Sequence, residues 1–467
     1  MKDFIKSFFI YGLATFVDKF IALFFIPIYA SYFPIDDFGR MEIIQSFTSI
    51  VSIFVFLQLE TFLQRHFFEY DNARIKILIS TLIFFVCILS LVVCIFSTFF
   101  SDYISSILLS DGESAGLIVM CSWQIPFIGL YTFSTIVLRF DKRYNSFVKL
   151  VLLSVILNIS LPSYFVIYRK LGLDGFFISQ LISIVILSIF SLYNIRKYLA
   201  LVISKSELFH AFVYALPQFP ARVGSVINTY ANRFFINIYL DTYSLGLFSI
   251  AIKISSVLQI IYQFFVTFWN QVLFEIKTKV NNKSILEVIF KLTNFSVFLI
   301  VSLLSLFSFE IVSLISQKFI ASHVFIGYLS FAIALLLVKE VVDVGPKYEK
   351  KTIYLSLNFG LSILVNLVSL ILFTPLYGLY GVCLSLILGN LFLLMSSWYF
   401  SWKLFPVAFC FKSFAICLLP CMVIFFVNDQ YQLSGNWGLK IILSVLLVTF
   451  YGFHFFKSLN VMKVLYS

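Results

Sequence analysis

The chain has 467 residues, of which 61% are hydrophobic and 12% are charged, and its formal net charge is +11. Soluble proteins carry about 25% charged residues, so a water-soluble fold has no place for this much apolar surface. A bilayer does, because its hydrocarbon core accepts helices of roughly 20 apolar residues. The composition therefore excludes soluble and disordered proteins and predicts an all-α polytopic membrane protein.

Apolar runs long enough to cross a membrane follow one another along the whole chain, and the loops between them leave no room for a separate soluble domain. The first run is longer than a signal-peptide core and has no A-x-A cleavage site, so we expect it to remain as a span. The sequence predicts about fourteen transmembrane helices, at 8–31, 41–62, 77–100, 116–138, 147–168, 173–195, 211–240, 247–270, 285–308, 323–345, 352–373, 379–400, 412–428 and 437–456.

The positions of the basic residues test this layout. With the N-terminus inside, 23 of the 33 Lys and Arg residues fall in inside loops or adjacent span ends, and five fall outside. Cytoplasmic loops of membrane proteins carry such an excess of Lys and Arg. The pattern predicts that both termini are cytoplasmic, and it explains the net positive charge without a nucleic-acid partner.

The chain also repeats itself at a nearly constant offset. GLDGFFIS at 172–179 matches GLYGVCLS at 378–385, and RFDKR at 139–143 matches KYEKK at 347–351. These matches predict a six-helix lobe over 1–200, a second over 201–405, and two additional C-terminal helices over 406–467. Because six is even, the two repeats have parallel orientation, and a substrate path is expected between them.

Charged side chains inside spans are the first candidates for function, because each costs about 2.5–3.5 kcal/mol to insert. Lys19, Arg222, Arg233 and Lys253 lie within predicted spans. By the repeat offset the first and seventh spans are equivalent, so Lys19 and Arg222 are expected at similar depths in the two lobes. Arg and Lys bind phosphate strongly where water is excluded. These residues predict a cationic cavity for a substrate that carries phosphates or other anions.

Polar residues at helical spacing support a lined cavity, since a lipid-facing helix does not carry such stripes. Arg222, Thr229 and Arg233 fall within roughly 20° of one direction on an ideal helix. Two further stripes are predicted, on the second and eighth spans: Glu42, Gln45, Ser49 and Ser52; Ser249, Lys253, Ser256 and Gln263.

Structural roles for the same charges stay open. Lys19 could form a bridge with Asp18 or Glu60, and these two carboxylates could instead be proton or sodium coupling sites. Lys253 and Arg233 could each extend towards the outer interface.

Metal and disulfide chemistry have little support. The seven cysteines lie almost entirely in apolar runs without a CxxC pair, and the four histidines show no metal-ligand spacing. Buried cysteines of this kind behave as small hydrophobic residues. We expect no metal and no cofactor, and the only energy source considered is a proton or sodium gradient.

The order of the segments resembles the oligosaccharide (O-antigen type) flippases of the multidrug/oligosaccharidyl-lipid/polysaccharide exporter superfamily. Many members have Asp-Arg where this chain has Asn232-Arg233, so a carboxylate beside Arg233 is missing. The segments that carry the resemblance are FFIPIYASYFPIDDFGRMEII at 24–44, LQRHFFEY at 63–70, YANRFFINIYLDTYSLGLFSIAIKI at 230–254 and NLVSLILFTPLYGLYG at 366–381.

The resemblance implies a flippase, not an enzyme, in the bacterial inner membrane. Such proteins move undecaprenyl-pyrophosphate-linked oligosaccharides from the cytoplasmic to the periplasmic leaflet through a V-shaped central cavity. Lys19, Arg222, Arg233 and Lys253 would hold the anionic part, with Arg65 near the cytoplasmic mouth. The implied partners are membrane lipid, a polysaccharide polymerase and a chain-length regulator. Open alternatives are a peptidoglycan-precursor flippase, a multidrug exporter, an uncoupled scramblase and a membrane glycan polymerase.

Overall fold

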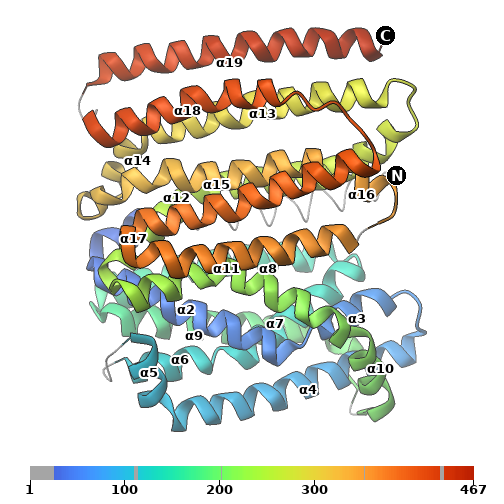
Figure 1. Cartoon of the computed structure of the whole chain (residues 1–467). Coiled ribbons are helices and arrows are strands. Elements are labelled where there is room, and N and C mark those ends of the chain that lie inside the picture. The colour runs from blue at the N-terminus through green and yellow to red at the C-terminus, as the bar shows by residue number, and fades with distance from the viewer. Residues whose placement is uncertain (1–25, 110–113, 201, 352, 432–435, 467) are drawn as a thin grey trace. The chain divides into compact units, whose positions relative to one another are not determined.

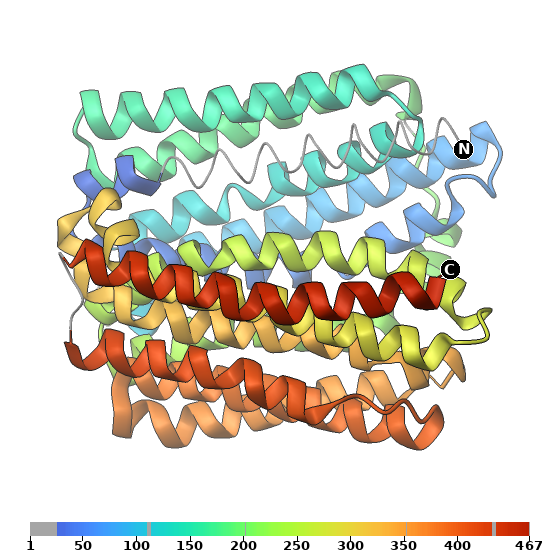
Figure 2. The same ribbon diagram turned by 90° about the horizontal axis from the view of Figure 1, so that it is seen from above.

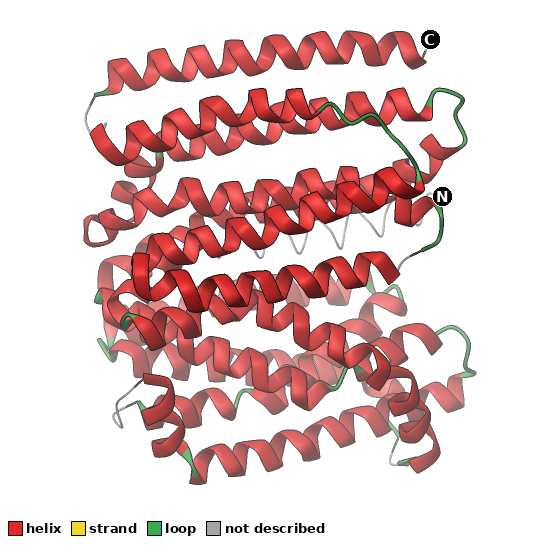
Figure 3. Ribbon diagram, viewed as in Figure 1, coloured by secondary structure: helices red, strands yellow, loops and turns green. Residues whose placement is uncertain are grey.

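The described part of the chain is a set of helices joined by short connections (Figure 3). The computed structural model describes residues 26–109, 114–200, 202–351, 353–431 and 436–466. No strand occurs within these ranges. The prediction of an all-α polytopic membrane protein is confirmed, because eleven of the described helices are long and apolar enough to span a membrane.

Contacts divide the chain into two compact units, Met1–Asn237 and Ile238–Ser467. The lobe boundaries at about 200 and 405 were predicted from sequence repeats, and they stay a prediction. The helices of the first unit are α2 (Ile35–Phe56), α3 (Leu59–His66), α4 (Asn72–Phe99), α5 (Ser101–Leu109), α6 (Ala115–Ser122), α7 (Ile125–Phe140), α8 (Tyr144–Pro162), η1 (Ser163–Tyr168), α9 (Gly172–Ile195), η2 (Arg196–Tyr198), α10 (Lys205–Ala215), η3 (Leu216–Gln218) and α11 (Phe219–Tyr239), whose last residues pass into the second unit. The long helices of the first unit run along a common direction, which the short helices α5 and α10 do not share (Figure 1). Figure 2 shows the same molecule from above.

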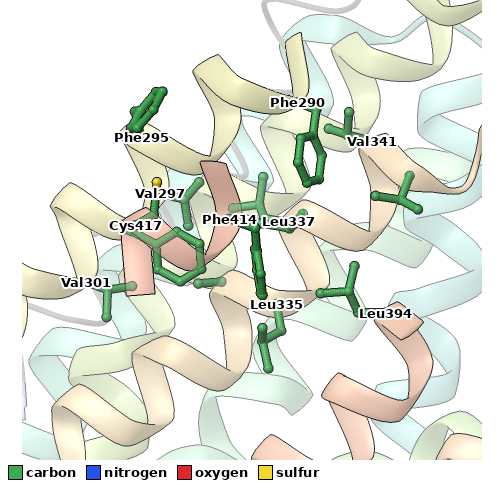
Figure 4. Packing of buried hydrophobic residues seen from close by; sticks show 14 of the residues in the cluster. Phe290, Phe295, Val297, Val301, Leu335, Leu337, Val341, Leu394, Phe414 and Cys417 are labelled. Carbon is green, nitrogen blue, oxygen red and sulfur yellow. The ribbon is translucent and has the colours of Figure 1, made fainter. Parts of the chain in front are cut away.

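The second unit is built around α13 and α15, which pack on each other and on their neighbours (Figure 4). Phe290 and Phe414 are fully buried between these helices, as expected for side chains that fill the interior of a helical bundle. Its helices are α12 (Thr242–Lys277), α13 (Asn282–Leu306), α14 (Ser308–Ile315), η4 (Gln317–Ser322), α15 (His323–Val342), α16 (Val344–Tyr348), α17 (Ile353–Leu404), α18 (Phe411–Tyr431) and α19 (Trp437–Tyr466).

The predicted count of fourteen spans stays a prediction. The first predicted span, 8–31, lies mostly outside the described residues. The 52-residue α17 is interrupted at Gly378, whose backbone is not helical, so it covers the eleventh and twelfth predicted spans. The helix α11 falls within the predicted span 211–240, but it is not among the eleven helices that are long and apolar enough to span a membrane.

Several predicted spans, among them 41–62 and 116–138, are broken where the sequence suggested continuous helices. The predicted span 41–62 ends at Phe56, because Leu57 and Gln58 adopt left-handed backbone angles and α3 starts afresh. The predicted span 116–138 is divided between α6 and α7. Pro126 lies in the first turn of α7, where the backbone N–H that proline lacks would have no partner within the helix. A proline inside a continuous helix would remove a hydrogen bond, so α6 and α7 do not join.

The backbone repeats at the positions where the sequence repeats. Gly172 and Gly378 both have positive φ, at 57° and 58°. Lys142 and Lys350, from the second pair of matching motifs, also share this conformation, at 53° and 57°. Only a few per cent of residues other than glycine adopt it. The matching motifs therefore form the same kind of turn in each unit, which supports an internal duplication.

Candidate functional site

A polar cavity of about 600 Å³ lies within the first unit. Its walls come from α2, from the break between α6 and α7, from α9 and from α11. Placing polar side chains within membrane helices costs free energy, because hydrocarbon cannot form hydrogen bonds with them, so a polar lining suggests a function. The polar residues of the lining are Glu42, Gln45, Ser46, Thr48, Ser49, Ser52, Gln124, Gln180, Arg222, Ser225, Thr229, Tyr230 and Arg233.

Two of the three predicted polar stripes face this cavity. All four members of the α2 stripe, and all three members of the α11 stripe, belong to its lining. Gln45 and Thr229 are therefore placed at a cavity wall, and the Thr229 hydroxyl donates to the Ser225 carbonyl at 2.9 Å. Their role in binding a substrate stays a prediction.

An ion pair joins the two stripes. Arg233 Nε donates to Glu42 Oε2 at 3.0 Å, and the two side chains are only 13% and 8% exposed. Arg233 Nη1 also donates to the Thr229 carbonyl at 2.9 Å. The carboxylate that Asn232 cannot supply on α11 thus comes from α2. Glu42 balances the charge of Arg233, which leaves Arg222 as the other cation among the described residues of the lining.

We expect Glu42→Gln and Arg233→Gln each to destabilise the protein. The double variant should lose less stability than the sum of the two single losses. A charge left without its partner in a largely buried site carries the full cost of desolvation. The coupling free energy in the double-mutant cycle should be about 0.5–3 kcal/mol. Thermal unfolding of the purified protein in detergent measures it, and additive single effects would show that the pair is not coupled.

Arg222 is exposed on the cavity wall, and its charge acts on Glu60. Glu60 lies in α3, outside the span that ends at Phe56. One of its carboxylate oxygens is buried and has no hydrogen-bond partner among the described residues. Burial raises the pKa of Glu60, while the backbone and the Arg222 guanidinium act in the opposite direction.

The raised pKa of Glu60 predicts a pH-dependent stability. A carboxyl whose pKa is higher in the folded than in the unfolded chain stabilises the fold below its ordinary pKa, near 4.5, and loses that contribution as the pH rises through the folded value. Glu60→Gln should remove this decline, so the variant should gain stability relative to wild type as the pH rises from 4 to 7. The measurement is the unfolding temperature of wild type and Glu60→Gln at several pH values in that range. A constant difference between the two proteins would contradict the prediction.

The remaining predicted residues are placed elsewhere or not described. Lys19 and Asp18 lie outside the described residues. Lys253 and Gln263 lie on α12, in the second unit. The Arg65 side chain is 62% exposed, and its Nη2 lies 3.4 Å from Oε1 of Glu69, four residues later.

Gln124 and Gln180 are lining residues that the sequence analysis missed. Gln124 is buried in the break between α6 and α7. Pro126 signals that break, and a polar residue two positions before a proline in an apolar run is the clue that could have identified Gln124. Gln180 has Ser183 three residues later and Ser191 eleven residues later on α9, and this helical spacing of polar residues is the clue that could have identified it.

The chain belongs to the family described as polysaccharide biosynthesis protein, whose model matches residues 33–317. No curated protein matches it in sequence. Its fold is similar to that of a lipid II flippase in an inward closed conformation, with a TM-score of 0.75 at 20% identity over 96% of this chain and 99% of that one. An inward-facing multidrug resistance MATE transporter matches with a TM-score of 0.59 at 14% identity, over 89% of this chain and 95% of that one.

These comparisons agree with the resemblance found in the sequence. The MATE protein is described as a member of the MOP superfamily, which is the multidrug/oligosaccharidyl-lipid/polysaccharide exporter group. Membership of the polysaccharide biosynthesis family is confirmed by the family model, and the similarity to the two transporter structures confirms the fold.

Proposed function

We propose that the chain is a flippase that moves undecaprenyl-pyrophosphate-linked oligosaccharide repeat units from the cytoplasmic to the periplasmic leaflet by alternating access. The units would serve the synthesis of a surface polysaccharide such as O-antigen or capsule. Membership of a polysaccharide biosynthesis family supports this proposal, as does a fold similar to that of a lipid II flippase. The proposed location is the bacterial inner membrane, with both termini cytoplasmic.

The observation that carries the proposal is the lining of the cavity in the first unit. Arg222 and Arg233 share it with the amides of Gln45, Gln124 and Gln180. Amide and hydroxyl groups suit the hydroxyls of a saccharide, and an arginine suits phosphate or an acidic sugar. Such a lining can desolvate a polar headgroup and replace its lost water contacts, while the lipid part stays in the bilayer.

Arg222 is the residue proposed to hold the anionic group, because Glu42 already balances Arg233. Lys19 and Lys253 remain proposed contributors. Asp18 and Glu60 remain proposed for coupling to a proton or sodium gradient, and a polymerase and a chain-length regulator are the proposed partners.

The function is tested in cells of the source organism that lack this gene. Lipid-linked repeat units should accumulate, and periplasmic reagents should not reach them until the gene is restored. Loss of a polymerase would instead leave single units exposed on the periplasmic side. Normal export without the gene would overturn the proposal.

A peptidoglycan-precursor flippase is the second candidate, since the lipid II flippase matches over nearly the whole chain. The chain should then replace that flippase in cells depleted of it, whereas an oligosaccharide flippase should not. A multidrug exporter of cationic drugs is disfavoured by the cavity, where Arg233 neutralises the one acidic residue among the described lining.

A further inference from the structure

A second charged cavity, of about 220 Å³, lies in the second unit and is independent of the function proposed above. It is formed at one end of the helices, where α13 and α18 begin and α19 approaches its last residues. Lys291 comes from α13, Lys412 from the first turn of α18, and Lys457 from α19. We refer to this cavity as the basic pocket.

The charges of the basic pocket are only partly balanced. Lys291 Nζ lies 2.6 Å from Glu287 Oε1, one turn earlier on α13. Lys412 and Lys457 are exposed, and neither has an acidic partner within 4 Å in the described part of the chain. The N–H groups at the start of α18 add a partial positive charge beside Lys412. The pocket therefore has a surplus of positive charge.

The other walls of the basic pocket are mainly apolar, and an apolar groove adjoins it. Val288, Phe295 and Ile416 contribute to the walls. His454 lines both the basic pocket and a groove of about 680 Å³ between α18 and α19. The groove is lined almost entirely by apolar side chains: Leu419, Pro420, Val423, Ile424, Leu443, Leu446, Leu447, Phe450 and Phe453.

We propose that the basic pocket binds the phosphate headgroup of an anionic bilayer phospholipid, whose acyl chains follow the groove between α18 and α19. Basic pockets between membrane helices on the cytoplasmic side bind such headgroups, and each lysine near the surface strengthens the attraction. The distribution of Lys and Arg predicts that this end of the helices is cytoplasmic. A positive pocket next to an apolar groove matches a ligand with a charged head and a hydrocarbon tail.

The experiment measures lipid bound to the purified full-length protein by native mass spectrometry, with phosphatidylglycerol and phosphatidylcholine as probes. Lys412→Gln/Lys457→Gln should weaken binding of phosphatidylglycerol about tenfold or more and leave phosphatidylcholine unchanged. Lys412→Arg/Lys457→Arg should keep the binding, because the charge is kept. Lys350→Gln/Lys351→Gln is the matched control, since it removes the same charge from two exposed lysines after α16.

Three results would overturn the proposal. The first is unchanged phosphatidylglycerol binding in the Lys412→Gln/Lys457→Gln variant. The second is an equal loss in the Lys350→Gln/Lys351→Gln control, which would indicate attraction to the whole basic end. The third is a preference for undecaprenyl phosphate over phosphatidylglycerol that the double variant abolishes, because the occupant would then be the carrier lipid.

Discussion

Arg222→Ala is expected to reduce translocation of the lipid-linked oligosaccharide about 10- to 100-fold. A hydrogen bond to a charged group contributes about 1.5–3 kcal/mol, and the loss of such a contact to an anionic headgroup gives a factor of this size. Arg222 is exposed on the wall of the cavity, so its removal leaves no cavity in a packed core. Transport should fall while the unfolding temperature changes little. Export of labelled repeat units in cells that lack the native gene measures the effect.

Two further variants separate binding from general electrostatics. Arg222→Lys keeps the charge but loses the planar, two-pronged donor, so its transport should lie between wild type and Arg222→Ala. Arg169→Ala removes one charge from an exposed position outside the cavity and should transport normally. Normal export by Arg222→Ala, with protein levels equal to wild type, would remove Arg222 from the proposed site.

Lys440→Met is expected to destabilise the protein by about 3–5 kcal/mol, the cost of leaving one member of a buried ion pair alone. Lys440 Nζ lies 2.7 Å from both carboxylate oxygens of Glu310, and Lys440 is fully buried. The contact joins the first turn of α19 to α14. Without the lysine, the carboxylate of Glu310 stays in a site that is only 14% exposed.

The paired variant Lys440→Met/Glu310→Gln should recover most of the lost stability, since two neutral groups replace the two charges. Unfolding can be followed with a thiol-reactive dye, because Cys417 and Cys421 are free, buried thiols of the same unit that become accessible on unfolding. A single variant as stable as wild type, or a double variant no better than the single, would show that the pair contributes little.

The polar faces of α2 and α11 could be predicted from the sequence, because helical periodicity is a local property. Glu42 and Gln45 were assigned to one face and Arg222 and Arg233 to another, and all four line one cavity. Their pairing was not predictable. Glu42 and Arg233 are 191 positions apart, and no spacing rule connects them. Only the tertiary fold, which places α2 and α11 at the walls of one cavity, brings the two charges together.

Lys440 is a second case in which the sequence does not reveal the partner of a charged residue. Lys440 is one of the five basic residues assigned to the outside, because it lies at the outer end of the last predicted span, 437–456, where a lysine is ordinarily solvated. Its burial follows from Glu310 on α14, 130 positions earlier, which hydropathy alone cannot match to it. Buried cysteines were easier to predict, since apolar neighbours in the sequence usually mean an apolar environment. Cys94, Cys121 and Cys383 are buried, as expected, and all seven thiols are free.

The paired glycine turns bear on which positions of the two matching segments can change in sequence. Gly175 and Gly381 follow the two positive-φ glycines by three residues, and a methyl group on either would press against the backbone of the preceding helix, at Phe165 and Phe373. Most lipid-facing side chains of a membrane helix can be replaced by other apolar residues, since lipid accepts many apolar shapes. Gly175 and Gly381 cannot be replaced in this way, because there is no space at either position for a side-chain carbon. If the two segments arose by duplication, their shared glycines are the positions expected to persist, and a search for half-length relatives should begin from them.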